Sequence, residues 1–139
     1  MIYVKPSGIR KIHDYVIESL GGESGLLNPS MLEVASERPR TIVYGHEPFA
    51  TLIAKAAALG YELIVGHPFV DGNKRTAIAS MFTMLWANSV FMTIPPYIVK
   101  YSIQAAKGEV DESKFTTLIE PLCTNSIYAF FWKYLRYMW

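Results

Sequence analysis

One segment near the middle of this 139-residue chain constrains its fold more than any other. Residues 73–88 read as a helix, and from Ala77 to Leu85 that helix is apolar on nearly every side. A helix of this kind is usually central and buried, because none of its sides faces water favourably. The rest of the chain is therefore expected to fold around it.

Five more segments have the features of helices. Gly21-Gly22 is typical of a helix end, and Asn28-Pro29 is typical of a helix beginning. Strand signals are weak and limited to residues 41–44 and 90–93. The sequence thus predicts an all-α fold, a compact bundle of about six helices. The expected helices cover residues 7–20, 29–38, 47–64, 73–88, 97–106 and 111–122.

The third of these helices has a clear apolar stripe. Thr51, Lys55 and Glu62 fall on the face opposite to it, away from the core. The next position along the stripe is His67, so a helix that extended this far would point His67 toward the interior or a cleft. The stripe itself recurs at spacings of three and four: Phe49, Leu52, Ile53, Ala56, Ala57, Gly60, Leu63 and Ile64.

The composition favours one domain with a substantial core, since 51% of the residues are apolar and 18% are charged. A net charge of +1 gives no indication of a nucleic-acid surface. The one cysteine, Cys123, excludes an intrachain disulfide and a Cys-based metal site and fits a reducing compartment. Residues 1–6 lack the layout of a secretory signal, and no apolar run reaches about 18 residues. We therefore expect a cytoplasmic protein without a membrane span.

A loop dense in reactive groups precedes the central helix. A glycine-containing loop that enters a helix collects unpaired N–H groups and the positive end of the helix dipole, so it is a natural phosphate site. Lys74 and Arg75 oppose that dipole unless an anion binds there. The loop therefore predicts a phosphate-handling active site. Its sequence is His67-Pro68-Phe69-Val70-Asp71-Gly72-Asn73-Lys74-Arg75.

Two residues of the loop are candidates for the reaction itself. His67 can act as a general base, because an imidazole titrates near neutral pH; a hydrogen-bonded histidine at a helix end is the alternative. Asp71 can hold Mg²⁺, which takes oxygen ligands and often only one or two carboxylates, or it can be an ordinary N-cap. The other histidines, His13 and His46, lack such a setting and are interpreted as structural or surface residues.

The remaining loop residues fit the binding of a nucleotide phosphate. Gly72 lets the backbone turn and approach a phosphate, and Asn73 either caps the helix or donates to a phosphate oxygen. Lys74 and Arg75 are expected to neutralise charge that develops during transfer. Phe69 is interpreted as a packing anchor that supports the loop from below.

The loop resembles the signature of the Fic/Doc superfamily, in its Doc (death-on-curing) toxin form. The segments Ile12-His13-Asp14, Gly21-Gly22 and Gly25-Leu26-x-Asn28-Pro29 resemble the opening of the same family. This resemblance spans roughly residues 2–120. It implies a helical bundle with the loop at the mouth of the central helix, and transfer of a phosphate-containing group from a nucleotide to a protein hydroxyl.

Two positions distinguish the branches of the superfamily. The AMP-transferring branch has glycine at the position of Lys74 and a second arginine at the position of Ile78. Doc-type members share the residues found here, which implies transfer of a phosphate from ATP, with Mg²⁺, to a Ser/Thr hydroxyl of a protein such as a translation elongation factor. AMP or nucleotidyl transfer is the alternative, and a non-catalytic interaction module is a third hypothesis.

The resemblance also implies a protein partner. Many members carry a self-inhibitory Ser/Thr-x-x-x-Glu-Gly/Asn helix, and no segment of this chain matches it in full. A Doc-type toxin without that helix is expected to be restrained by a separate antitoxin, whose disordered segment folds on binding.

The end of the chain lies outside the resemblance. We expect a catalytic domain over residues 1–122 and a helical extension of that domain over residues 123–139. Three interpretations of this extension are open: a helix that closes the core, a surface for a homodimer or another partner, and contact with a membrane interface. Its aromatic residues are Tyr128, Phe130, Phe131, Trp132, Tyr134, Tyr137 and Trp139.

Overall fold

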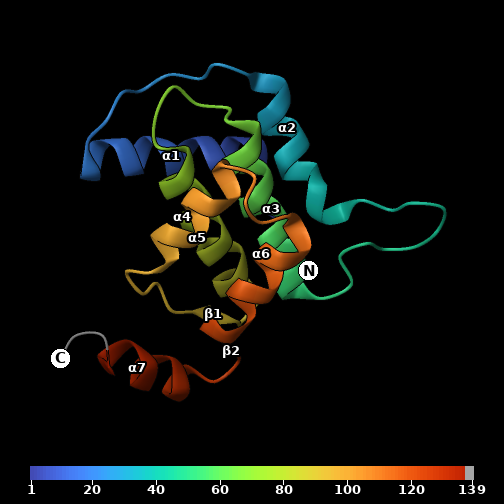
Figure 1. Cartoon of the computed structure of the whole chain (residues 1–139), viewed down its shortest axis with the longest axis vertical. Helices are drawn as coiled ribbons and strands as arrows, with labels where there is room; N and C mark the ends of the chain where they lie inside the picture. Colours follow the sequence, from blue (N-terminus) through green and yellow to red (C-terminus); the bar gives the residue numbers. More distant parts are fainter. Residues whose placement is uncertain (137–139) are drawn as a thin grey trace.

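The computed structural model describes residues 1–136, without the side chain of Tyr134, and this part of the chain is mostly helical (Figure 1). The prediction of an all-α fold is confirmed. A two-stranded antiparallel sheet pairs β1 (Phe91–Met92) with β2 (Cys123–Thr124), and short 3-10 turns follow α2 and α6. The α-helices are α1 (Pro6–Leu20), α2 (Pro29–Glu37), α3 (Leu52–Gly66), α4 (Asn73–Ala87), α5 (Ile98–Ala106), α6 (Glu112–Ile119) and α7 (Ile127–Arg136).

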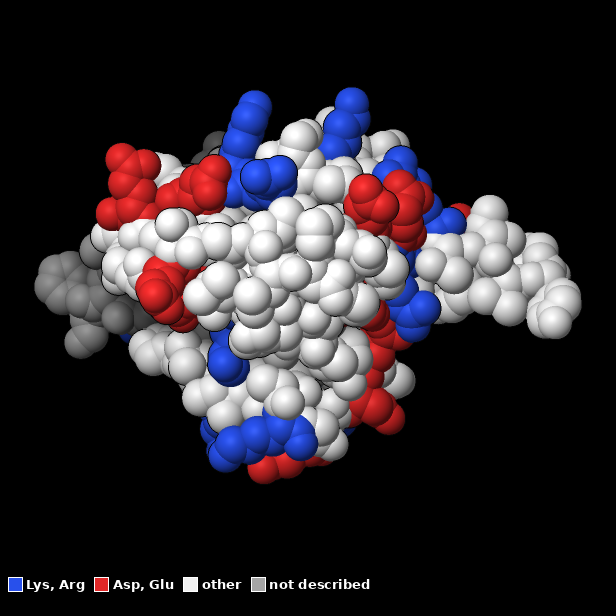
Figure 2. Space-filling model, turned by 90° about the horizontal axis from the view of Figure 1, so that it is seen from above, with Lys and Arg blue, Asp and Glu red and all other residues white. Residues whose placement is uncertain are grey.

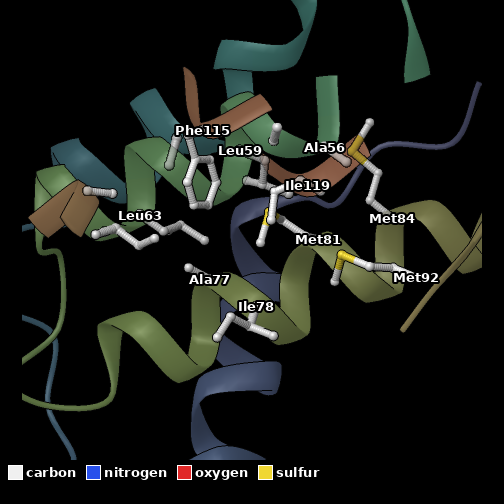
Figure 3. Packing of buried hydrophobic residues seen from close by; sticks show 14 of the residues in the cluster. Ala56, Leu59, Leu63, Ala77, Ile78, Met81, Met84, Met92, Phe115 and Ile119 are labelled. Atoms are coloured by element: carbon white, nitrogen blue, oxygen red, sulfur yellow. The ribbon is translucent and has the colours of Figure 1, made fainter. Parts of the chain in front are cut away.

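Helix α4 is the buried centre that the sequence predicts. It packs along α3 and also contacts α1 and α5, and Met81, Met84 and Leu85 have no exposed surface. Figure 3 shows Leu63 of α3 and Ala77 and Met81 of α4 between the two helices, whereas Ile78 lies on the side of α4 away from α3. At Gly60 the two helices approach so closely that an added Cβ would lie 2.4 Å from the sulfur of Met81. The absence of a side chain at Gly60 therefore sets the spacing between α3 and α4.

The beginning of α3 differs from the prediction. The helix begins at Leu52, where the Thr51 hydroxyl accepts a hydrogen bond from the Ala54 N–H (3.1 Å). Residues 41–51 form a projecting loop instead, seen at the right of Figure 1 and as an arm with an uncharged tip in Figure 2. Phe49 is nevertheless buried, with the guanidinium of Arg38 5.0 Å from its ring centre. Phe49 is therefore apolar because the loop buries it, and not because it belongs to the stripe of α3.

Lys55, which the sequence places on the face of α3 opposite the apolar stripe, is buried there instead of facing solvent. Its side chain is 4% exposed, and its Nζ donates a hydrogen bond to the carbonyl oxygen of Pro39 (3.1 Å). The carboxylate of Glu47 lies 3.6 Å from the same Nζ. The connector between α2 and α3 thus lies against this face of α3 and supplies the partners that a buried ammonium needs.

The C-terminal helix α7 closes one side of the core through Phe130, which is 6% exposed. The ring of Phe130 lies against those of Phe82, Trp86 and Phe91, with centroid distances of 5.8–6.5 Å. This matches the core-closing interpretation of the extension. Its other face stays exposed, with Tyr128 at 85%, Phe131 at 52% and Trp132 at 71%. Tyr137 and Trp139 lie outside the described residues.

Within residues 1–136, no helix has the length and apolar character needed to cross a membrane.

We expect Gly60→Ala to lower the free energy of unfolding by about 1–3 kcal/mol, because the new methyl group would overpack the contact with buried Met81. Urea denaturation followed by circular dichroism measures this change. Gly8→Ala in α1 is the control, since its Cβ would meet only Val4 at 3.3 Å and alanine favours a helix by about 0.5–1 kcal/mol. Equal stabilities of the two variants would contradict the role assigned to Gly60.

Candidate active site

The loop between α3 and α4 lines a cleft of about 300 Å³ at the end of the central helix. Helix α3 ends at Gly66, and His67 follows in the left-handed conformation (φ 50°), so the stripe of α3 does not extend to it. His67 is exposed and lines the cleft. The cleft brings together the predicted site residues His67, Asp71, Gly72, Asn73, Lys74 and Arg75, and Val99 and Ile103 of α5 form an apolar wall.

Asn73 fastens the loop from within. Its Oδ1 accepts a hydrogen bond from the Phe69 N–H, and its Nδ2 donates one to the Phe69 carbonyl, both at 2.9 Å. The sequence left two roles open for this side chain, a helix cap and a phosphate donor, and the structure gives it a third. Gly72 occupies the N-cap position of α4 with a φ of 77°, so Asp71 does not serve as the cap either.

Phe69 supports the loop, as the sequence predicts, and a histidine on α1 completes that support. Phe69 is 2% exposed, and the ring of His13 stacks on it with centroids 3.7 Å apart and planes within 4°. The Nε2 of His13, itself buried, donates a hydrogen bond to the carbonyl oxygen of Asp71 (2.7 Å). Sequence reasoning gave His13 no part in the site. The signal available was its place in the segment that resembles the opening of the family.

The segment before α2 runs beside the loop and pairs with it through the backbone. The N–H groups of Leu27 and Asn28 both donate to the Pro68 carbonyl (2.8 and 3.0 Å). The Val70 N–H donates to the Gly25 carbonyl (3.0 Å). A segment that lies at least 40 residues earlier in the sequence therefore holds the loop through its backbone, at one end of the molecule (Figure 1).

Asp71 presents an ionised carboxylate at the cleft. Its Oδ2 accepts a hydrogen bond from the Glu23 N–H (3.1 Å), and its Oδ1 accepts one from the Gly72 N–H (2.7 Å). These two bonds, helped by the charge of Arg75, hold the pKa of the Asp71 carboxyl below its ordinary value. Because the side chain is 49% exposed, its remaining lone pairs can reach a ligand.

This carboxylate fits a magnesium ion that arrives with a nucleotide. Among the described residues, no group of three or more His, Cys, Asp or Glu side chains could hold a metal ion on its own. Mg²⁺ needs no such group, because it is often bound through one or two carboxylates together with substrate phosphates and water. The donor set of the cleft is thus compatible with Mg²⁺ at Asp71.

The two cations of the loop differ in their surroundings. Lys74 is exposed on the first turn of α4 and lines the cleft. Arg75 donates from one terminal nitrogen to the Gly21 carbonyl (2.8 Å), and its other terminal nitrogen lies 3.9 Å from Asp71 Oδ1. Ile78 is 9% exposed and belongs to the apolar core. The cationic side chains that α4 supplies to the cleft therefore end at its first turn.

Comparison with known proteins agrees with this geometry. The model of the Fic/DOC family matches residues 3–85, which hold α1 to α3, the loop and nearly all of α4. The chain belongs to the Fic/DOC family. The members of this family that it resembles include "Toxin Doc" of Mycolicibacterium smegmatis, with 43% identity over 72 residues. That match covers 52% of this chain and 55% of the relative, so the chain spans about half of the relative's length.

A second relative aligns along most of the chain. "Protein kinase doc" of Escherichia phage P1 is 29% identical over 122 residues. The alignment covers 88% of this chain and 96% of that protein. The similarity to this relative therefore extends beyond residues 3–85, the part of the chain that the family model matches.

We expect Asn73→Ala to destabilise this Fic/DOC protein by about 2 kcal/mol or more, because the buried N–H and C=O of Phe69 both lose their partner. Chemical denaturation measures the loss, and hydrogen exchange at the Phe69 amide locates it. Lys74→Ala is the neighbouring control and should leave stability nearly unchanged, since Lys74 is exposed. A stable Asn73→Ala protein with a protected Phe69 amide would contradict this account of the loop.

Proposed function

We propose that this protein is a Doc-type toxin that transfers a phosphate group from ATP to a Ser or Thr hydroxyl of a target protein. One observation carries the proposal: a single cleft collects the His67 imidazole, the Asp71 carboxylate and the cations of Lys74 and Arg75 at the N-terminus of α4. The two relatives support the proposal in different ways, since one is named as a toxin and the other as a protein kinase.

In the proposed reaction, His67 takes the proton of the attacking hydroxyl. The hydroxyl oxygen forms a bond to the γ-phosphorus, the bond from that phosphorus to the β–γ bridging oxygen breaks, and ADP leaves. Lys74, Arg75 and the first N–H groups of α4 stabilise the negative charge on the phosphate oxygens. Mg²⁺, with Asp71 as its protein ligand, would neutralise further phosphate charge when it is bound.

Phosphate transfer is favoured over AMP transfer by two side chains. Lys74 lies in the cleft, at a position where the AMP-transferring branch leaves open space with glycine. Ile78 lies in the core, at the position where that branch has a second phosphate-binding arginine. AMP transfer on the same loop remains the alternative function.

A toxin of this type needs restraint inside its own cell. We propose that a separate antitoxin protein provides it, because no segment of the chain matches the self-inhibitory helix found in many members of the superfamily. A translation elongation factor is the proposed class of target, by analogy with Doc-type members.

We expect the purified chain, supplied with Mg²⁺ and a cell extract, to transfer label from γ-labelled ATP and not from α-labelled ATP. His67→Ala should lower the transfer rate by about 10³-fold or more, because it removes the base. His46→Ala is the matched control, since His46 lies in the projecting loop outside the cleft and its loss should leave the rate unchanged.

Three other results would overturn the proposal. Label from α-labelled ATP would establish AMP transfer and remove the argument from Lys74. Full activity of His67→Ala would exclude His67 as the base. No label from either nucleotide would favour a non-catalytic interaction module.

A further inference from the structure

The short segment Gly21–Glu23, which follows α1, forms hydrogen bonds with two charged side chains of the cleft, Asp71 in the loop and Arg75 in α4. The backbone N–H of Glu23 donates to Oδ2 of Asp71 (3.1 Å). The backbone carbonyl of Gly21 accepts from the guanidinium of Arg75 (2.8 Å). The residues on either side of Gly22 thus bind the anion and the cation of the cleft, one each.

Gly22 itself lies against both groups. A Cβ added at Gly22 would lie 2.6 Å from Oδ2 of Asp71 and 2.9 Å from a terminal nitrogen of Arg75. Both distances are too short for van der Waals contact, so one or both groups would have to move. Asp71 has a short side chain held by two backbone N–H groups, so its displacement would break at least one of these bonds.

These contacts determine geometry more than stability. Both hydrogen bonds from the segment are exposed, and residues 21–23 are exposed as well. Exposed polar contacts of this kind contribute little to the free energy of folding. They do, however, fix the orientation of two side chains that have to meet a nucleotide phosphate in one arrangement, and such positioning affects rate strongly.

We infer that the segment Gly21–Glu23 holds Asp71 and Arg75 in the arrangement that binds the nucleotide. Gly22 is then a positioning residue, because any side chain at this position would push the two groups out of that arrangement. This inference rests on the proposed function. Only backbone groups of residues 21 and 23 take part, and an added Cβ at Gly21 would have no heavy atom within 4 Å, so within the segment an added side chain would clash with the two groups at position 22 alone.

Gly22→Ala tests the inference, with Gly108→Ala as the matched control. Both glycines have a positive φ (120° and 73°), so both substitutions strain the backbone. An added Cβ at Gly108 would have no heavy atom within 4 Å, so this variant carries the strain without the intrusion. We expect Gly22→Ala to lose more Tm than Gly108→Ala, because a φ of 120° lies outside the left-handed region that alanine can enter at modest cost. The comparison of binding and rate is therefore made at a temperature where both variants are folded.

The variants should differ in binding and in rate. We expect Gly22→Ala to bind ADP with Mg²⁺ about 10-fold more weakly by calorimetry and to transfer phosphate about 100-fold more slowly, as for a displacement of about 1 Å at a reacting centre. Gly108→Ala should match the wild type in both measurements. Equal ADP affinity and equal rate in the two variants would overturn the inference.

A nuclear magnetic resonance readout separates this inference from the proposed function. In the wild type, the Glu23 amide is expected to exchange slowly and to shift on Asp71→Ala, which removes its acceptor. In Gly22→Ala that protection should be lost. A Glu23 amide unaffected by Asp71→Ala would overturn the inference even if Gly22→Ala failed to fold.

If the wild type transferred no phosphate, the proposed function would fail. ADP binding and the Glu23 amide signal would still decide this inference.

Discussion

The packing of α4 against α3 is the constraint on which the rest of the structure depends. Met81, Met84 and Leu85 are fully buried on the inward side of α4, whereas Thr83 on its other side is exposed. The N-terminal end of α4 opens into the cleft, where unpaired N–H groups and the dipole favour an anion. The packing of this helix thus determines where its N-terminus, and with it the candidate active site, lies.

The loop that enters α4 is held by contacts from distant parts of the chain. Asn73 binds the backbone of Phe69 from within, and His13 stacks on Phe69 from α1. The segment before α2 adds backbone hydrogen bonds to Pro68 and Val70. A loop fastened at so many points can keep a left-handed His67 and a positive-φ Gly72 in place, which a free nonapeptide would not do.

The electrostatics of the cleft follow from the same supports. Hydrogen bonds from the backbone N–H groups of Glu23 and Gly72 lower the pKa of Asp71, and the Gly21 carbonyl accepts a hydrogen bond from the guanidinium of Arg75 beside it. Opposite charges are thus placed together at the helix terminus before any ligand arrives. A nucleotide phosphate with its metal ion would match such a pair, because the metal ion would face the Asp71 carboxylate and the phosphate would face the Arg75 guanidinium.

The sequence by itself determined the all-α class, the buried central helix and the composition of the loop, because helical periodicity and local motifs are written in neighbouring residues. Only the tertiary structure decided which groups meet. It buried Lys55 beneath the connector before α3, turned Asn73 inward onto Phe69, and brought His13 and Gly22 to the site. These contacts join residues that are far apart along the chain or depend on the path of a loop, so no local pattern specifies them.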